Sequence, residues 1–152
     1  SQQIISAYAI GAEEILRRHN NTECVVAIRV GDSMYLAHTP AGEKFYEKYG
    51  ETIKSAISMN PLKQRRVIKT DKQRIRIKTA HLDDYISVSI AHANPSEITA
   101  RVKLNRIYAK AKEVLEDVRE YLERVRQTQP SALVHYFARA GNGIVTSPKP
   151  SK

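Results

Sequence analysis

The residue types that usually carry catalysis or bind metal are few and scattered in this sequence. Five histidines lie far apart, and none stands near Cys24 or a carboxylate at a spacing that metal sites use; they are His19, His38, His81, His92 and His135. Cys24 opens a predicted core strand, where a lone cysteine is usually a small buried hydrophobe. Asp83 and Asp84 fall in a predicted turn, which explains two adjacent carboxylates without catalysis. The sequence predicts no catalytic residue and no metal site.

The glycines do not form a phosphate-binding loop. Such loops need glycines at fixed offsets before a helix, whereas here they stand at Gly11, Gly31, Gly42, Gly50, Gly141 and Gly143. We expect neither a P-loop nor a dinucleotide fingerprint, and no cofactor. We therefore expect a protein that is not an enzyme and works by binding partners.

Positive charge is concentrated in one short segment. Residues 63–78 contain eight cations against a single acid, Asp71, so they carry seven of the nine net positive charges of the chain. The cations are Lys63, Arg65, Arg66, Lys69, Lys72, Arg74, Arg76 and Lys78. Within 74–78 they alternate with Ile75 and Ile77, so one face of an extended strand carries a basic stripe. These eight residues are the predicted site for an anion or a charged partner.

The basic stripe has two interpretations. It is either a surface that binds phosphates or acidic protein, or a solvated sheet face whose Lys and Arg protect an edge from unwanted pairing. A nucleic-acid partner would be contacted mainly through backbone phosphates, because Tyr35 and Tyr85 are the nearby aromatics and Trp is absent. An acidic protein would use the same stripe for steering.

Length and composition favour one globular domain. The chain has 152 residues, of which 41% are hydrophobic and 27% charged, enough to bury a core without disulfides. A single cysteine fits a reducing cytoplasm. No apolar run approaches the roughly 20 residues of a membrane-spanning helix, so we expect no membrane span and a cytoplasmic location.

Hydrophobic periodicity predicts the order α-β-β-α-β-β-β-α. The predicted elements are a helix over 2–19, strands over 24–30 and 34–38, a helix from Thr39-Pro40 to about 60, strands over 65–70, 74–78 and 86–90, and a helix over 95–126. Gly31-Asp32-Ser33 supplies the first hairpin turn, and Asn94-Pro95-Ser96-Glu97 is a complete helix start. We expect a three-layer α/β sandwich with a five-stranded, mainly antiparallel sheet covered by helices on both faces.

The last helix is long for a small domain. Its hydrophobic stripe from Leu104 to Val125 follows a heptad pattern. A helix of 32 residues with a rise of 1.5 Å per residue is about 48 Å long, whereas a small domain is about 30 Å across. Its last turns therefore either project beyond the domain or meet a second copy of the chain or another protein. We divide the chain into a domain over 1–126 and a flexible tail over 127–152. An apolar island within the tail, Leu133, Val134, Tyr136 and Phe137, makes a docking subunit of a larger assembly one alternative.

Four stretches of the sequence carry a resemblance to a known family. They are the first hairpin over 24–33, the second helix, the strand over 74–78, and the strand over 86–90 that leads through Asn94-Pro95 into the last helix. With the element order, over about residues 2–120, they resemble the roadblock (dynein light-chain) family of small homodimeric proteins. That family includes bacterial and archaeal regulators of small GTPases. Unlike the family pattern, the second helix carries large and charged residues over 43–49 where small ones are usual.

The resemblance implies a homodimeric adaptor or regulator, with a small GTPase as one candidate partner that would itself carry any GTP chemistry. The third strand and second helix form the dimer contact in that family. The matching residues here are Phe45, Tyr49, Ile53, Arg66, Val67 and Ile68. Two Arg-rich third strands meeting antiparallel would repel unless acids or anions intervene. The alternative from another class is a nucleic-acid-binding module that uses the hairpin over 63–78.

Overall fold

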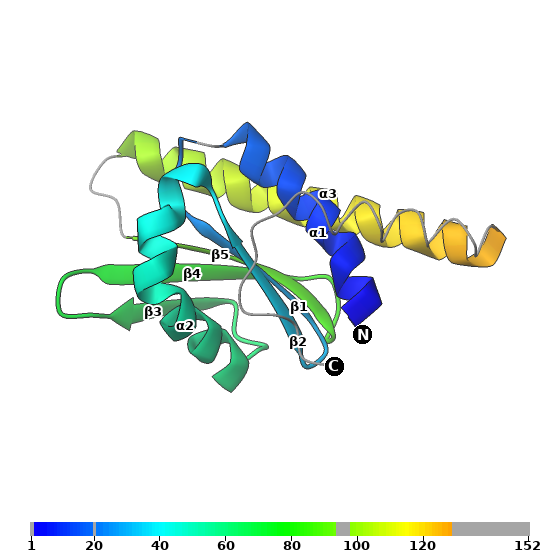
Figure 1. The fold of residues 1–152 in the computed structure, drawn as a ribbon, viewed down its shortest axis with the longest axis horizontal. Helices are drawn as coiled ribbons and strands as arrows, with labels where there is room; N and C mark the ends of the chain where they lie inside the picture. Colours follow the sequence, from blue (N-terminus) through cyan, green and yellow to red (C-terminus); the bar gives the residue numbers. More distant parts are fainter. Residues whose placement is uncertain (1, 20, 94–97, 129–152) are drawn as a thin grey trace.

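The computed structural model describes residues 2–19, 21–93 and 98–128 of the chain (Figure 1). Its elements are α1 (Gln2–Arg18), β1 (Val25–Val30), β2 (Ser33–His38), the 3-10 turn η1 (Pro40–Gly42), α2 (Glu43–Met59), β3 (Arg65–Lys69), β4 (Arg74–His81), β5 (Ile86–Ala93) and α3 (Ile98–Thr128). This is the order predicted from hydrophobic periodicity.

The strands form one five-stranded sheet within the described residues, in the spatial order β2-β1-β5-β4-β3. Every pairing is antiparallel. β1 lies inside the sheet, paired with both β2 and β5, and Gly31 at the β1–β2 turn has a φ of 61°, a conformation that favours glycine. The order leaves β2 and β3 as the two edges.

One face of the sheet is covered by α1 and α3. The side chains of Val26 and Ile28 on β1 and of Val88 and Ile90 on β5 are buried there with residues of both helices, among them Ile15 and Leu115. The side chains that alternate with these, such as Val25 and Ala27, point to the other face. Each strand of the sheet centre is thus buried on both faces, as predicted.

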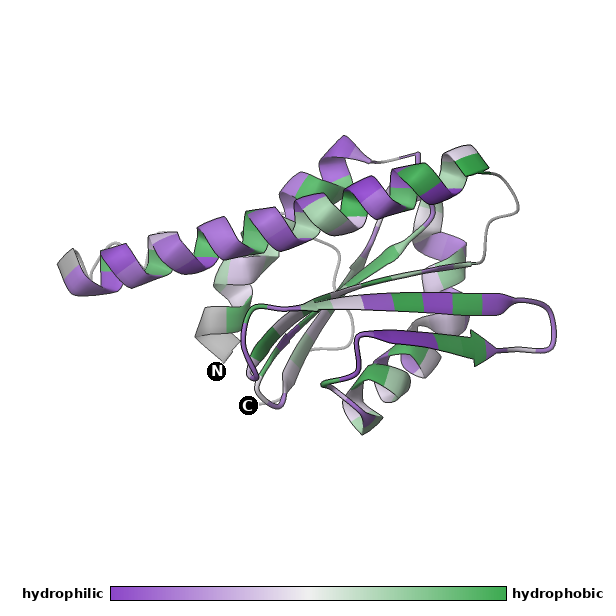
Figure 2. Cartoon of the chain, turned by 180° about the vertical axis from the view of Figure 1, so that it is seen from behind, coloured by the Kyte–Doolittle hydropathy of each residue, from purple (hydrophilic) through white to green (hydrophobic). Residues whose placement is uncertain are grey.

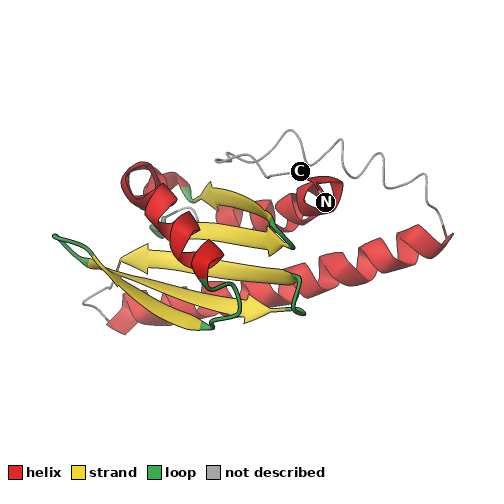
Figure 3. Ribbon diagram, turned by 90° about the horizontal axis from the view of Figure 1, so that it is seen from below, coloured by secondary structure: helices red, strands yellow, loops and turns green. Residues whose placement is uncertain are grey.

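The opposite face is covered by α2 (Figures 1 and 3). Phe45, Tyr49, Ile53 and Ile57 form its buried stripe, and they pack against strand residues that include Leu36, Ile75 and Ile77. The three-layer α/β sandwich is confirmed: α1 and α3 form one layer, the sheet the second and α2 the third.

The second helix starts with a 3-10 turn. Thr39 is the N-cap and Pro40 the first helical residue, as the sequence predicts, but residues Pro40–Gly42 are 3-10 and α2 begins at Glu43. Thr39 is also hydrogen-bonded to Cys24, the residue before β1. The Thr39 N–H donates to the carbonyl of Cys24 at 3.1 Å, and the Thr39 Oγ1 accepts from the N–H of Cys24 at 3.2 Å. A Cβ on Gly42 would come within 2.7 Å of that same carbonyl, so the turn packs tightly against the start of β1.

β4 and β5 are longer than predicted because each stabilises the other. They pair from Ile75 opposite Ala93 to His81 opposite Ser87. The last helix runs to Thr128, and its C-terminal turns extend past the sheet (Figure 1). The predicted helix start over 94–97 and the tail from 129 onwards, with its apolar island, lie outside the described residues.

Candidate functional site: a basic groove and an open strand edge

Two rows of cations share one face of β3 and β4. Arg65 lies opposite Lys78, Val67 opposite Arg76, and Lys69 opposite Arg74, so all six side chains point to the same side. The alternating residues Ile75 and Ile77 are buried against α2, which places the cations on the α3 side. The alternation along β4 is visible as purple and green bands in Figure 2.

The N-terminal part of α3 lies beside this basic face and closes it into a groove of about 630 Å³. We define the basic groove by its charged or titratable side chains, which are Lys63, Arg65, Arg66, Arg76, Lys78, His92 and Arg101. In the described part of the chain, none of the residues that line it is acidic. Asn105 and Leu104 of α3 complete its wall. The site is therefore strongly cationic.

A contact between β4 and α3 holds one wall of the groove. Lys78 Nζ lies 4.2 Å from the centroid of the Tyr108 ring, a cation–π contact. The Tyr108 hydroxyl donates to the carbonyl of Thr79 at 3.2 Å, and burial raises the pKa of that hydroxyl. Leu104, one turn earlier on α3, is buried. The lysine is thus positioned by two rigid elements.

His92 brings a titratable group to the groove. It lies directly opposite Arg76 across the β4–β5 ladder, and its Nδ1–H donates to the carbonyl of Ala93 at 2.7 Å. Burial lowers the pKa of His92 below 6.5, and the positive charge of Arg76 lowers it further, against the opposing effect of the Ala93 bond. The ring is therefore neutral at neutral pH, with Nε2 unprotonated.

Arg66 borders the groove but its guanidinium is engaged elsewhere. It donates to the carbonyls of Ala56, Asn60 and Lys63, at 2.7 Å to Asn60 and 3.2 Å to Lys63. These are carbonyls of the last turn of α2 and the loop after it, which have no partner within the helix. Arg66 thus fastens the end of α2 to β3.

The eight cations predicted as a binding site divide into two groups. Those bordering the groove are Lys63, Arg65, Arg66, Arg76 and Lys78, and those further along the β3–β4 hairpin are Lys69, Lys72 and Arg74. Sequence reasoning missed His92, Arg101 and Asn105. The predicted strand ended at residue 90, before His92, which reaches the cations by the pairing of β5 with β4. Arg101 and Asn105 lie in the predicted helix and reach them through the packing of α3 beside the sheet.

Among the strands that the structure describes, none pairs with the outer side of β3, which is therefore an open edge of the sheet. The register of β3 with β4 continues to Gln64 opposite Thr79, whose N–H donates to the Gln64 carbonyl at 2.7 Å. Bonded and non-bonded pairs alternate along an antiparallel ladder. The backbone N–H and C=O groups of Arg65, Val67 and Lys69 therefore point away from β4, to the outside of the sheet. Val67 is 46% exposed.

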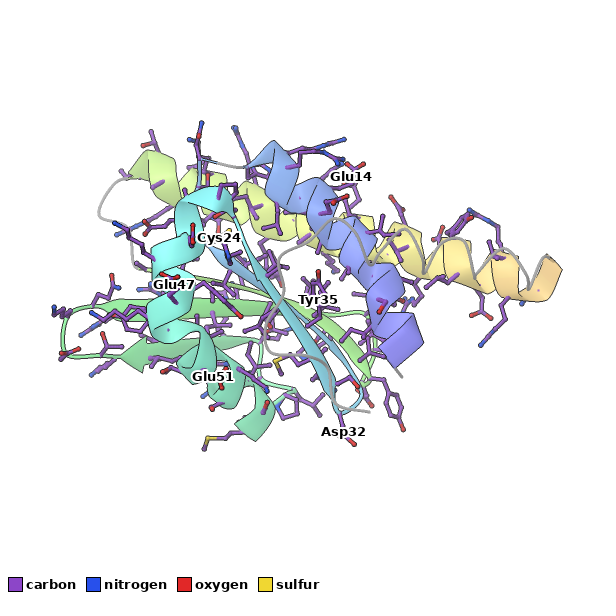
Figure 4. All side chains as sticks on the ribbon, in the orientation of Figure 1. Glu14, Cys24, Asp32, Tyr35, Glu47 and Glu51 are labelled. Atoms are coloured by element: carbon purple, nitrogen blue, oxygen red, sulfur yellow. The ribbon has the colours of Figure 1, made fainter. Side chains whose placement is uncertain are left out.

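The residues that the resemblance assigns to a dimer contact lie in different environments. Phe45, Tyr49 and Ile53 are buried under α2 within the single chain, whereas Arg66 and Ile68 are half-buried and Val67 is exposed. What α2 offers to a partner is its outer face, which carries exposed Lys44, Glu47, Lys48 and Glu51; Figure 4 labels the two glutamates.

Other groups that could do chemistry have structural surroundings. Burial raises the pKa of the Cys24 thiol to about 12, so it stays protonated at neutral pH. Asp83 Oδ1 accepts from the N–H groups of Tyr85 and Ile86 at 2.8 and 2.9 Å, as expected of a turn. Among the residues that the structure describes, no three His, Cys, Asp or Glu side chains gather where they could hold a metal ion.

Comparisons with known proteins give no match: none to models of protein families, none to curated proteins and none to solved structures. No helix within the described ranges is both long enough and apolar enough to cross a membrane. We therefore base the functional proposal on the fold and on the geometry of the basic groove and of the open edge of β3.

Proposed function

We propose that this chain is a non-catalytic, roadblock-like adaptor that pairs with a second copy of itself through β3 and the adjoining α2, and that it regulates a protein partner. The observation that carries the proposal is the open edge of β3. Its outward N–H and C=O groups at Arg65, Val67 and Lys69 are a ready template for another strand. β3 and α2 are also the elements to which the resemblance assigns the dimer contact.

Apolar surface beside this edge supports pairing. Met59 at the end of α2 is 85% exposed and Leu62 in the following loop is 57% exposed, while Val67 is 46% exposed on β3 itself. Burying such side chains against a second copy would stabilise the pair by about 25 cal/mol for each Å² of apolar surface removed from water. The buried residues Phe45, Tyr49 and Ile53 would support α2 from within.

The charges on β3 determine how the pair responds to salt. An antiparallel pairing centred on Val67 sets Arg65 opposite Lys69 of the second copy, twice across the two-fold axis. Like charges directly opposite destabilise a ladder, and salt screens exposed charges. The pair should therefore strengthen as salt concentration rises, or when an anion binds between the two basic faces.

The protein partner would meet α2. Its outer face carries both signs of charge, with Glu47 and Glu51 beside Lys44 and Lys48, so recognition there would be polar. A small GTPase is the candidate that the resemblance supplies. In that case this chain would act by stabilising one nucleotide state of the partner through differential binding.

Light scattering of two variants at position 67 tests the pairing. Val67→Pro removes an outward N–H without touching the β3–β4 ladder, whereas the matched Val67→Thr keeps that N–H. The native protein and Val67→Thr should show twice the mass of the 17.2 kDa chain, and Val67→Pro should be monomeric with an unchanged circular dichroism spectrum. A native chain that stays monomeric at high concentration and high salt would refute the proposal.

A further inference from the structure

We infer that the basic groove binds the phosphodiester backbone of a nucleic acid, without reading its sequence. This inference does not rest on the proposed pairing, because all the residues of the groove belong to one chain. It goes beyond the predicted hairpin site, since the groove also takes His92 from β5 and Arg101 from α3.

The extent of the charge favours a polymer over a single phosphate. Arg74, Arg76 and Lys78 form a row of about 14 Å on β4, at about 3.4 Å per residue, and Arg65 and Lys69 form a parallel row on β3. Arg101 faces these rows from α3 across the groove. One phosphate could engage only part of this field. A chain of regularly spaced phosphates can engage all of it.

The shape and lining of the groove favour a nucleic acid over a membrane or an acidic protein. A flat lipid surface cannot reach the floor of a groove that lies between a sheet and a helix. The centre of a protein–protein interface is usually depleted of charged residues. Here six of the residues that line the groove are Lys or Arg, and none of the described lining residues is acidic.

The chemistry of the lining favours contact with the backbone and not the bases. Arg65, Arg76 and Arg101 present planar guanidinium groups that match phosphate oxygens two at a time. No Phe, Tyr or Trp side chain is among the residues that line the groove within the described ranges, and Lys78 lies over the nearby Tyr108 ring. Base stacking has no Phe, Tyr or Trp platform there, so affinity should depend little on sequence.

Fluorescence anisotropy with a short labelled duplex and the corresponding single strand tests the inference, each measured over a series of salt concentrations. The variant is Arg65→Glu with Arg76→Glu, which reverses two exposed cations of the groove. Its matched control is Lys44→Glu with Lys48→Glu, which makes the same change in net charge on the outer face of α2. Both proteins are first checked for native circular dichroism and thermal unfolding.

The native protein should bind both probes, with log Kd rising linearly with log salt. The groove variant should bind at least about tenfold more weakly, and its slope for duplex should fall by about 0.9 for each phosphate that it no longer neutralises. The control should retain native affinity and slope. Equal reductions in affinity in both variants would overturn the inference, because net charge alone would then explain binding, and so would failure of the native protein to bind at low salt.

A competition experiment distinguishes a nucleic-acid partner from an acidic protein and from a membrane surface. Polyglutamate and vesicles containing phosphatidylserine are added to the protein–oligonucleotide complex at equal charge concentration. Neither should displace the oligonucleotide. Displacement by polyglutamate would overturn the inference in favour of an acidic protein, and displacement by vesicles in favour of a membrane surface. The native mass of the free protein, measured separately, shows whether the pairing proposal stands or fails independently.

Discussion

The Lys78 ammonium group lies over the ring of Tyr108 at 4.2 Å, and this contact joins the basic strand to the long helix. The Tyr108 hydroxyl adds a hydrogen bond to the carbonyl of Thr79, the residue next to Lys78. One tyrosine of α3 therefore does two separable things: its ring positions a groove cation, and its hydroxyl fixes α3 to β4.

Substitutions at Tyr108 should separate those two roles. Tyr108→Phe removes the hydroxyl, so the free energy of unfolding should fall by about 0.5–1.5 kcal/mol while oligonucleotide affinity stays native. Tyr108→Leu also removes the ring, and affinity should drop by about twofold to fivefold, the equivalent of about 0.5–1 kcal/mol. Urea unfolding and anisotropy measure the two quantities. Equal affinities in both variants would show that the ring does not position Lys78.

His92 should make oligonucleotide binding depend on pH. Its pKa lies below 6.5 in the free protein because of burial and the Arg76 charge, with Arg101 also across the groove. Bound phosphates favour the protonated ring and raise its pKa, so binding takes up a proton; affinity should rise as pH falls toward the pKa of the free protein and level off below it. In the free protein the same lowered pKa means that stability declines as pH falls below 6.5.

The control for His92 is His92→Gln, which keeps a polar side chain that does not titrate. Its oligonucleotide affinity should be nearly constant across the pH range in which the native affinity changes. His38 and His81 are still present in this variant, so they act as an internal control. An unchanged pH profile in His92→Gln would assign the effect to another group.

Arg65 and Arg66 are neighbours in sequence, but substituting each should change a different property: oligonucleotide affinity for Arg65 and stability for Arg66. Arg66→Met removes the donor to the carbonyls of Ala56, Asn60 and Lys63, of which the Asn60 carbonyl keeps the Lys63 N–H, so it should cost about 1–3 kcal/mol of stability and alter affinity little. Arg65→Met removes a groove cation, so it should weaken oligonucleotide binding and leave stability nearly unchanged. Chemical unfolding and anisotropy on both proteins provide the comparison. The reverse pattern would contradict the roles assigned to the two guanidinium groups.

Arg65→Glu should act in opposite directions on pairing and on nucleic-acid binding. In the pair it replaces a repulsion with an attraction to Lys69 of the second copy, so dimerisation should strengthen and no longer require salt. In the groove it weakens phosphate binding. Analytical ultracentrifugation and anisotropy report the two effects. If Arg65→Glu dissociated the pair, the antiparallel arrangement centred on Val67 would be wrong.

The parts of the fold that could be predicted are those decided by local pattern. Alternation along 74–78 assigned Arg76 and Ile77 to opposite faces, and the stripe of Phe45, Tyr49 and Ile53 marked the buried side of α2; both are confirmed. The start at Thr39-Pro40 is confirmed, but its 3-10 form was not predicted, nor was the bonding of the Thr39 backbone and hydroxyl to Cys24, 15 residues earlier in the chain. No periodicity reveals such a contact.

The site was predictable only in part for the same reason. The segment 63–78 is conspicuous by charge alone, but the role of Arg66 depends on carbonyls presented by the end of α2. Arg101 joins the groove through the packing of α3 beside the sheet, and His92 through the pairing of β5 with β4. Arg101 does stand three residues before the stripe residue Leu104, a spacing that marks it as a neighbour of the buried face.

Amide hydrogen exchange along β3, measured at several protein concentrations, is the most direct test of the pairing that the proposed function requires. The outward N–H groups of Arg65, Val67 and Lys69 should be protected at high concentration and exchange freely at low concentration. Those of Arg66 and Ile68, which face β4, should be protected throughout. Rapid exchange at Arg65, Val67 and Lys69 at every concentration, in high salt and with oligonucleotide present, would contradict the account.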